Sequence, residues 1–198
     1  TNVMYGALAF YQECHRYGIK PILGLELEMD SVGNKRLLFL AKNKQGYQNL
    51  LELSSRKMIA KEETPTRELT VADIGGFLRG LAIILLPDAN REDGIFAGAQ
   101  LMYARQILPD LQKITARAQL FLGIDERVHP DLLAEARTLS AQAEIKTVAC
   151  SQVRYLKSTD YFSVEVLQAV KNDQKLTKDQ LSKRAAGLDY LKTSAEYQ

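Results

Sequence analysis

The chain has 198 residues, of which 46% are hydrophobic and 25% are charged, a profile typical of a soluble globular protein with one large domain or two small ones. Its formal net charge is +2, so no basic stripe by itself indicates a nucleic-acid partner, and its longest apolar runs fall far short of the roughly 20 residues that cross a bilayer. The two cysteines, Cys14 and Cys150, lie far apart, which argues against a zinc knuckle or a disulfide framework and favours a reducing compartment such as the cytoplasm.

The first predicted unit is a helix, a turn and a strand between Met4 and Glu28. Apolar side chains recur with the 3.6-residue period of a helix, and Gly18 ends it. These side chains are Met4, Leu8, Phe10, Tyr11 and Cys14. Residues 21–28 begin as a continuous apolar run and then alternate, which predicts a strand buried on both faces whose C-terminal end emerges into a polar site. Glu26 stands near that end, where ligands gather in parallel sheets, although an acid there can also simply face solvent.

The elements that follow are predicted from apolar periodicity and turn residues. They are a strand at 36–41, a helix from 46 to about 59, a polar loop at 61–67, a short helix at 71–77 and a strand at 81–87. The strand at 36–41 is expected to form a hairpin with the first strand or to lie close to it. Thr70 is the candidate N-cap of the short helix.

The second half of the chain alternates strands and helices. The predicted elements are a helix at about 93–108, a strand at 119–124, a helix at 130–143, a strand at 146–150, a helix at 159–170, a polar tail at 172–183, a late strand at 188–192 and a terminal helix that starts at Ser194. This order favours an α/β architecture with mainly parallel strands, in an open sheet or a barrel.

Motifs for common chemistry are scarce. The sequence contains neither a G-x-G-x-x-G nor a G-x-x-x-x-G-K loop, and it has only two histidines, His15 and His129. His15 falls on the polar side of the first helix. His129 comes shortly after Asp125 and Glu126 at a strand end, so a metal-binding or acid–base role stays open for it.

Four segments carry a resemblance to a known family. They are 4–11, 18–24, 40–43 together with 46–51, and 190–196. In this order they resemble the N-terminal polymerase-and-histidinol-phosphatase (PHP) domain of the bacterial DNA polymerase III alpha subunit. The resemblance implies that residues 1–198 form one PHP domain, a distorted seven-stranded β/α barrel truncated at its N-terminus, whose first strand and His-x-His motif lie upstream of Thr1.

The resemblance also implies where a metal site would lie. Family members that keep the site hold metal ions at strand ends with His, Asp and Glu and hydrolyse phosphoesters. Glu26 matches the family's acid, whereas the family's histidines fall on Thr1, Arg127 and Arg154, and Gln152 replaces an aspartate. Gln has no charge and Arg is a permanent cation, so the resemblance implies a degenerate site with no metal, no cofactor and no catalytic residue in this chain.

Three functions remain as hypotheses. The first is a structural and partner-docking module of a DNA-directed DNA polymerase, whose absent domains carry out magnesium-dependent nucleotidyl transfer and contact DNA. Its expected partners are those domains, a proofreading exonuclease subunit and other replisome proteins in the bacterial cytoplasm, and no membrane. The second is an active metal-dependent phosphoesterase or 3′–5′ exonuclease that uses Glu26, Asp125 and His129. The third is an unrelated α/β enzyme.

Two physical expectations follow from the degenerate site and the missing strand. A carboxylate that has lost its metal needs another cation, so we predict an ion pair from Arg154, or failing that Arg127, to Glu26. Absence of an upstream strand would also leave apolar flanks uncovered, and such patches drive association or lower the melting temperature.

Overall fold

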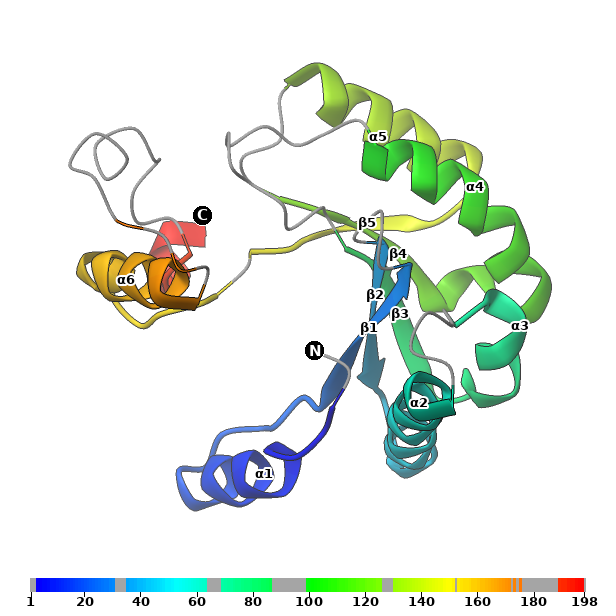
Figure 1. Ribbon diagram of the computed structural model, residues 1–198. Helices are drawn as coiled ribbons and strands as arrows, with labels where there is room; N and C mark the ends of the chain where they lie inside the picture. The colour runs from blue at the N-terminus through cyan, green and yellow to red at the C-terminus, as the bar shows by residue number, and fades with distance from the viewer. Residues whose placement is uncertain are drawn as a thin grey trace. The chain divides into compact units, whose positions relative to one another are not determined.

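The computed structural model of the chain describes residues 3–30, 35–63, 69–86, 99–125, 130–151, 153–171, 173, 175 and 189–197. The chain divides into two compact units (Figure 1). Unit 1 comprises residues 1–90 and 96–149, and unit 2 comprises residues 91–95 and 150–198. No helix in the described part of the chain is long and apolar enough to span a membrane.

Unit 1 contains a five-stranded sheet in which the strands lie side by side in chain order. The strands are β1 (Gly24–Asp30), β2 (Lys35–Ala41), β3 (Leu81–Leu85), β4 (Leu120–Ile124) and β5 (Lys146–Ala149). Strand β2 pairs antiparallel with both β1 and β3, whereas β3, β4 and β5 pair in parallel. The predicted hairpin neighbour of the first strand is therefore confirmed.

The prediction of mainly parallel strands is wrong for the first half of the sheet. Four residues separate β1 from β2, and a connection this short joins only antiparallel strands. Helices also lie between β2 and β3, yet these two strands pair antiparallel, so alternation of strands and helices predicts the pairing correctly only between β3 and β4 and between β4 and β5. The described residues thus form a mixed α/β sheet.

Helices α1 to α5 of unit 1 follow the predicted order. They are α1 (Ala7–Arg16), α2 (Lys44–Glu63), α3 (Val71–Ile74), α4 (Ala99–Ile114) and α5 (Pro130–Gln142), with short 3-10 helices η1 (Gly75–Phe77) and η2 (Arg117–Gln119). Thr70 caps α3 as predicted: its side chain accepts from the Asp73 N–H, and Asp73 in turn accepts from the Thr70 N–H at 2.8 Å.

Helix α4 differs from its predicted bounds. Its predicted first residues, 93–98, lie outside the described residues, and the helix continues through Pro109 to Ile114 instead of ending at Leu108. Proline inside a helix costs a backbone hydrogen bond. Leu111, one turn further on, is fully buried, so packing of that turn offsets the cost.

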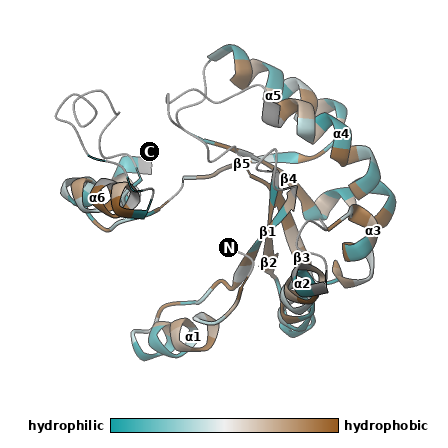
Figure 2. Cartoon of the chain, in the orientation of Figure 1, coloured by the Kyte–Doolittle hydropathy of each residue, from teal (hydrophilic) through white to brown (hydrophobic). Residues whose placement is uncertain are grey.

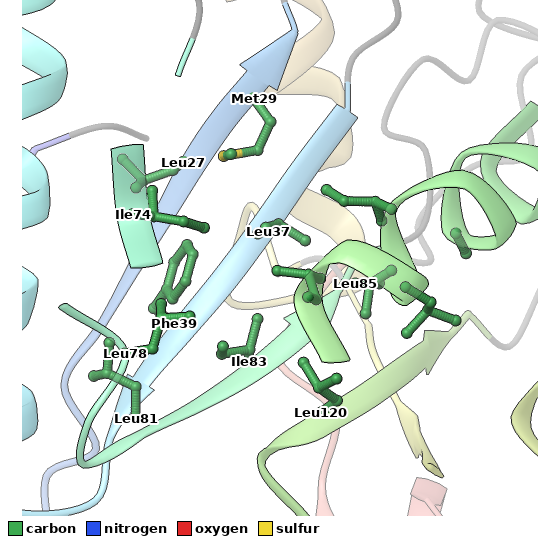
Figure 3. Close-up of a cluster of buried hydrophobic side chains, with 14 of the residues drawn as sticks. Leu27, Met29, Leu37, Phe39, Ile74, Leu78, Leu81, Ile83, Leu85 and Leu120 are labelled. Carbon is green, nitrogen blue, oxygen red and sulfur yellow. The ribbon is translucent and has the colours of Figure 1, made fainter. Parts of the chain in front are cut away.

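The sheet has a core face that packs against helices. Alternate residues along the strands point to this face, and their exposed fractions do not exceed 6%. The core face consists of Leu25, Leu27, Met29, Leu37, Phe39, Leu81, Ile83, Leu85, Leu120 and Leu122 (Figure 3). Buried residues of α2, α3, α4 and α5 belong to the same cluster. The alternation also corrects the prediction that β1 is buried on both faces, because Glu26 and Glu28 on its other face are only half-buried.

A close contact fixes the start of α2 against the turn before β3. A Cβ atom built on Gly46 would lie 2.1 Å from the carbonyl oxygen of Gly80. Asn43 Oδ1 accepts from the Gly46 N–H at 2.9 Å, and Asn49 Nδ2 donates to the Arg79 carbonyl at 2.7 Å. Residues 40–51, one of the segments that carry the family resemblance, therefore serve to pack the backbone here.

Helix α1 exposes the apolar stripe that predicted it. Leu8, Phe10 and Tyr11 are 64%, 51% and 42% exposed, whereas Cys14 is buried. Figure 2 shows that α1 carries hydrophobic as well as hydrophilic residues. The predicted stop is confirmed at Gly18, which has a positive φ of 67°.

Unit 2 contains the 3-10 helix η3 (Ser158–Asp160), helix α6 (Tyr161–Lys171) and the 3-10 helix η4 (Ser194–Tyr197). The predicted late strand is reduced to a single parallel bridge between Tyr155 and Tyr190, and residue 188 lies outside the described residues. The predicted helix start at Ser194 is confirmed, in the form of one 3-10 turn.

Candidate functional site

The second face of the sheet, which we call the Glu26 face, carries the candidate site. The register of the strands places Glu26, Leu38, Ile84 and Phe121 next to one another across β1 to β4. Unlike the core face it combines charged and apolar side chains, and Glu26, Leu38 and Phe121 are half-buried. A carboxylate in such surroundings needs a compensating partner.

Arg36 supplies this partner from the neighbouring strand. Its Nη1 atom donates a hydrogen bond to Oε1 of Glu26. The Arg36 side chain is 11% exposed and that of Glu26 is 25% exposed. Arg36 lies directly opposite Glu28 in the antiparallel register, so Glu26 is its diagonal neighbour on the same face. The pair thus links β1 to β2 at a place where most water is excluded.

Backbone contacts fix the end of β1 as well. Lys57 of α2 is buried, and its Nζ atom donates to the carbonyl oxygen of Glu28 at 2.8 Å.

Glu26 is the third of the seven residues of β1, so it lies within the strand and not at its carboxyl end as expected. The prediction of an emerging strand end is therefore wrong for Glu26.

Asp125 is the second acid of the candidate site that the structure describes. It follows β4 directly and is only 2% exposed. Strand alternation assigns Asp125 to the same face as Phe121. Of the other predicted positions, Arg127, His129 and Gln152 lie outside the described residues.

Arg154 belongs to unit 2 and is engaged there. Its Nε atom lies 3.7 Å from Oδ2 of Asp189, and its N–H donates to the Asp189 carbonyl at 2.7 Å. The predicted pair of Arg154 with Glu26 would join the two units and stays a prediction, and Arg127, its alternative, lies outside the described residues. Within unit 1 the Glu26 carboxylate pairs with the guanidinium of Arg36, which is the kind of partner that was expected.

A divalent metal, which the family resemblance implies for members with an intact site, does not fit the donors that the described residues bring to Glu26. Magnesium and manganese prefer several converging oxygen ligands. Among the described residues no three His, Cys, Asp or Glu side chains come together as such a group. The guanidinium of Arg36 also donates to Oε1 of Glu26 and so competes with a metal for that oxygen.

Arg36 is the site residue that the sequence reasoning missed, although a signal for it exists. The predicted strand at 36–41 was expected to form a hairpin with the first strand, and a register for this hairpin brings Arg36 within reach of Glu26. Arg36 is a cross-strand neighbour of Glu26 and is not aligned with a metal ligand of the family, so the resemblance does not point to it.

Comparison with known proteins agrees with this architecture. Residues 1–127 match the family model of the PHP domain. DNA polymerase III subunit alpha of Bacillus subtilis (strain 168) is 27% identical over 181 residues, which make up 89% of this chain and 16% of that protein. The namesake from Halalkalibacterium halodurans is 24% identical over 176 residues, or 86% of this chain and 15% of that protein. The protein of the same name from Streptococcus pyogenes is 30% identical over 118 residues, which make up 59% of this chain and 11% of that protein. The chain thus spans about one sixth of the length of the first of these relatives.

Proposed function

The chain belongs to the PHP domain family, and on this premise we propose that it is the PHP domain of a bacterial DNA polymerase III alpha subunit, with a degenerate metal site and a structural and partner-docking role. The observation that carries the proposal is the similarity to alpha subunits along 89% of the chain. In this proposal residues 1–198 form a single domain, and the sheet is part of a distorted seven-stranded barrel.

Nucleotidyl transfer is assigned to parts of the relatives that this chain does not match. Those parts would bind DNA and the magnesium that a polymerase uses. The partners proposed for the PHP domain are the remaining polymerase domains, a proofreading exonuclease subunit and other replisome proteins in the bacterial cytoplasm.

The Arg36–Glu26 pair supports a structural role for the Glu26 face. Hydrolysis by a metal site needs a metal-activated water, and therefore carboxylates with lone pairs free for the metal. At Glu26 a lone pair is instead used by an arginine that is itself mostly buried. This arrangement favours a face that holds strands together over one that turns over substrate.

A second candidate is a metal-dependent phosphoesterase or 3′–5′ exonuclease that uses Glu26, Asp125 and His129. The observation in its favour is Asp125, a buried acid immediately after β4. Carboxyl ends of parallel strands are a common location of catalytic groups.

Hydrolysis assays separate the two candidates. Purified protein is incubated with a chromogenic phosphodiester and with single-stranded DNA labelled at its 3′ end, in the presence of manganese or zinc. We expect the wild type and Glu26→Gln to show the same turnover, at the level of the buffer blank. The control variant is Glu52→Gln, which changes an exposed carboxylate of α2. Turnover that Glu26→Gln abolishes and Glu52→Gln leaves intact would establish the phosphoesterase and refute the structural role.

A further inference from the structure

Arg36 places a permanent cation at Glu26. We infer that Arg36 is the resident cation of the Glu26 face and occupies the position that a divalent metal would need at Glu26, so that this face is stabilised without metal and is closed to it. The inference rests on the proposed function and goes further, because it names the group that replaces the metal and the physical means by which the metal is kept out.

The two side chains depend on each other because both lie largely out of water. With exposed fractions of 11% for Arg36 and 25% for Glu26, loss of Arg36 leaves the Glu26 carboxylate without this guanidinium in a partly desolvated place. Such a loss costs more than the net stabilisation that the intact pair contributes. Arginine keeps its proton at every pH at which proteins fold, so the cation at Glu26 is permanent.

The position of the pair gives it a mechanical role. Strand β1 is the first strand of the described sheet and pairs there with β2 alone. Its core face is held by burial of Leu25, Leu27 and Met29. On the opposite face the diagonal Arg36–Glu26 contact joins β1 to β2. A bound metal would perform this cross-linking in a site with more ligands.

Exclusion of metal follows from the same contact. A divalent cation that approaches Glu26 must compete for the carboxylate with the hydrogen bond from Arg36 Nη1 and must overcome repulsion from a positive charge a few ångströms away. Removal of the guanidinium relaxes both barriers, but the described residues bring no group of three metal ligands together. We therefore expect metal binding neither in the wild type nor in Arg36→Met.

The experiment compares Arg36→Met, Glu26→Gln and the double variant with the wild type. Arg36→Lys is the conservative variant because it keeps the charge but loses the planar fork. Arg56→Met and Glu52→Gln form the matched control, since Arg56 and Glu52 are an ion pair with an Nε–Oε1 distance of 3.0 Å whose side chains are about half exposed. Melting temperature and urea midpoint are measured with and without Mn²⁺.

We expect Arg36→Met to lower the melting temperature by about 5–10 °C. The double variant should lose clearly less than the sum of the two single losses, whereas the Arg56–Glu52 control should be additive. Millimolar Mn²⁺ should change the melting temperature of none of these proteins, because the described residues bring no group of three metal ligands together. Arg36→Lys should fall between Arg36→Met and the wild type in metal-free buffer.

Additive losses, or a rise in the melting temperature of the wild type with Mn²⁺ that Glu26→Gln abolishes, would overturn the inference. Should Arg36→Met fail to fold, the inference requires that adding Glu26→Gln restores folding, and failure to restore it counts against the pair. These results are independent of the hydrolysis assays: turnover by the wild type refutes the proposed function, whereas additivity refutes only the role of Arg36.

Discussion

The described parts of unit 1 and of unit 2 are each stabilised by different interactions. In unit 1 the core face of the sheet and four helices share one hydrophobic cluster. In the described part of unit 2 Ala169 is the only buried hydrophobic residue, while Phe162, Leu167 and Val170 of α6 are 50%, 68% and 73% exposed. Apolar burial is the dominant source of stability in globular proteins, so unit 1 must contain most of it.

Polar contacts order the described part of unit 2 instead. The Asp189 N–H donates to Tyr155 Oη at 3.2 Å, and the Leu191 N–H donates to the Tyr155 carbonyl at 3.0 Å. Glu196 accepts from the hydroxyls of Tyr190 and Thr193. Single hydrogen bonds contribute about 0.5–1.5 kcal/mol each, and exposed ones respond to pH and salt. The stability of the two units should therefore respond differently to the same change in pH or salt.

The largest expected effect is that of Phe39→Ala in unit 1. Phe39 is fully buried in the centre of the core face (Figure 3), and its truncation leaves a cavity that the neighbouring helices cannot fill. We expect the free energy of unfolding to fall by about 3–5 kcal/mol, measured by urea denaturation. Leu38→Ala is the matched control on the adjacent, half-buried position and should cost clearly less. Equal losses would mean that the two faces of the sheet contribute equally.

Gly46→Ala tests the contact between α2 and the turn before β3. A Cβ atom at Gly46 would clash with the backbone carbonyl of Gly80, so the helix start or the turn must shift. We expect a loss of about 1–3 kcal/mol in the free energy of unfolding. Gly76→Ala is the control because a Cβ there meets nothing within 4 Å, and it should be neutral or slightly stabilising. A neutral Gly46→Ala would contradict the close approach.

Local patterns in the sequence predicted the elements of unit 1 well. Periodicity identified each of its strands, because one side of each strand must be buried and the other need not be. It failed where a non-local term decided the outcome. Helix α4 continues past Pro109 because Leu111 is buried, and the local sequence pattern did not indicate that burial. Similarly, the stripe of α1 predicted a helix correctly but not that its Leu8 would stay exposed.

The candidate site was predicted only in part for the same reason. Glu26 was identified from its position in an apolar strand and from the family resemblance. Its partner Arg36 depends on the pairing of β1 with β2, which is a contact between strands and not a property of either one. Arg154 was chosen because it occupies a ligand position, yet its described ion-pair partner is Asp189, 35 residues further along the chain (189 − 154).

Thr70→Ala probes a polar contact that lies inside unit 1. The Thr70 side chain caps α3 in a reciprocal arrangement with Asp73. Loss of an N-cap typically costs about 1 kcal/mol, and we expect a decrease of that size in the urea denaturation of this variant. Thr138→Ala is the control, since the Thr138 hydroxyl donates to the Ala134 carbonyl within α5 and alanine is the better helix former. If both variants are equally stable, the cap contributes nothing.

The smallest expected effect concerns the pH response of Glu196 in unit 2. The hydrogen bond from Tyr190 Oη, followed by those from the Thr193 N–H and hydroxyl, lowers the pKa of Glu196 from its ordinary value of 4.5 to about 2. A lowered pKa in the folded state means that the unfolded state binds the proton more readily. The stabilisation is therefore complete above pH 4.5 and is lost as the pH falls toward 2.

Tyr190→Phe removes the largest contribution and should raise the pKa of Glu196 toward its ordinary value, because the Thr193 donors remain. The measurement is an NMR titration of the Glu196 carboxyl carbon in both proteins. Thr193→Ser keeps a hydroxyl and a backbone N–H at the cap and should leave the titration close to that of the wild type. Identical titration of Glu196 in Tyr190→Phe and the wild type would contradict this account. Since Glu196 is fully exposed, solvent screens these contacts, and the melting of unit 1, which depends on the buried core, should not follow the same titration.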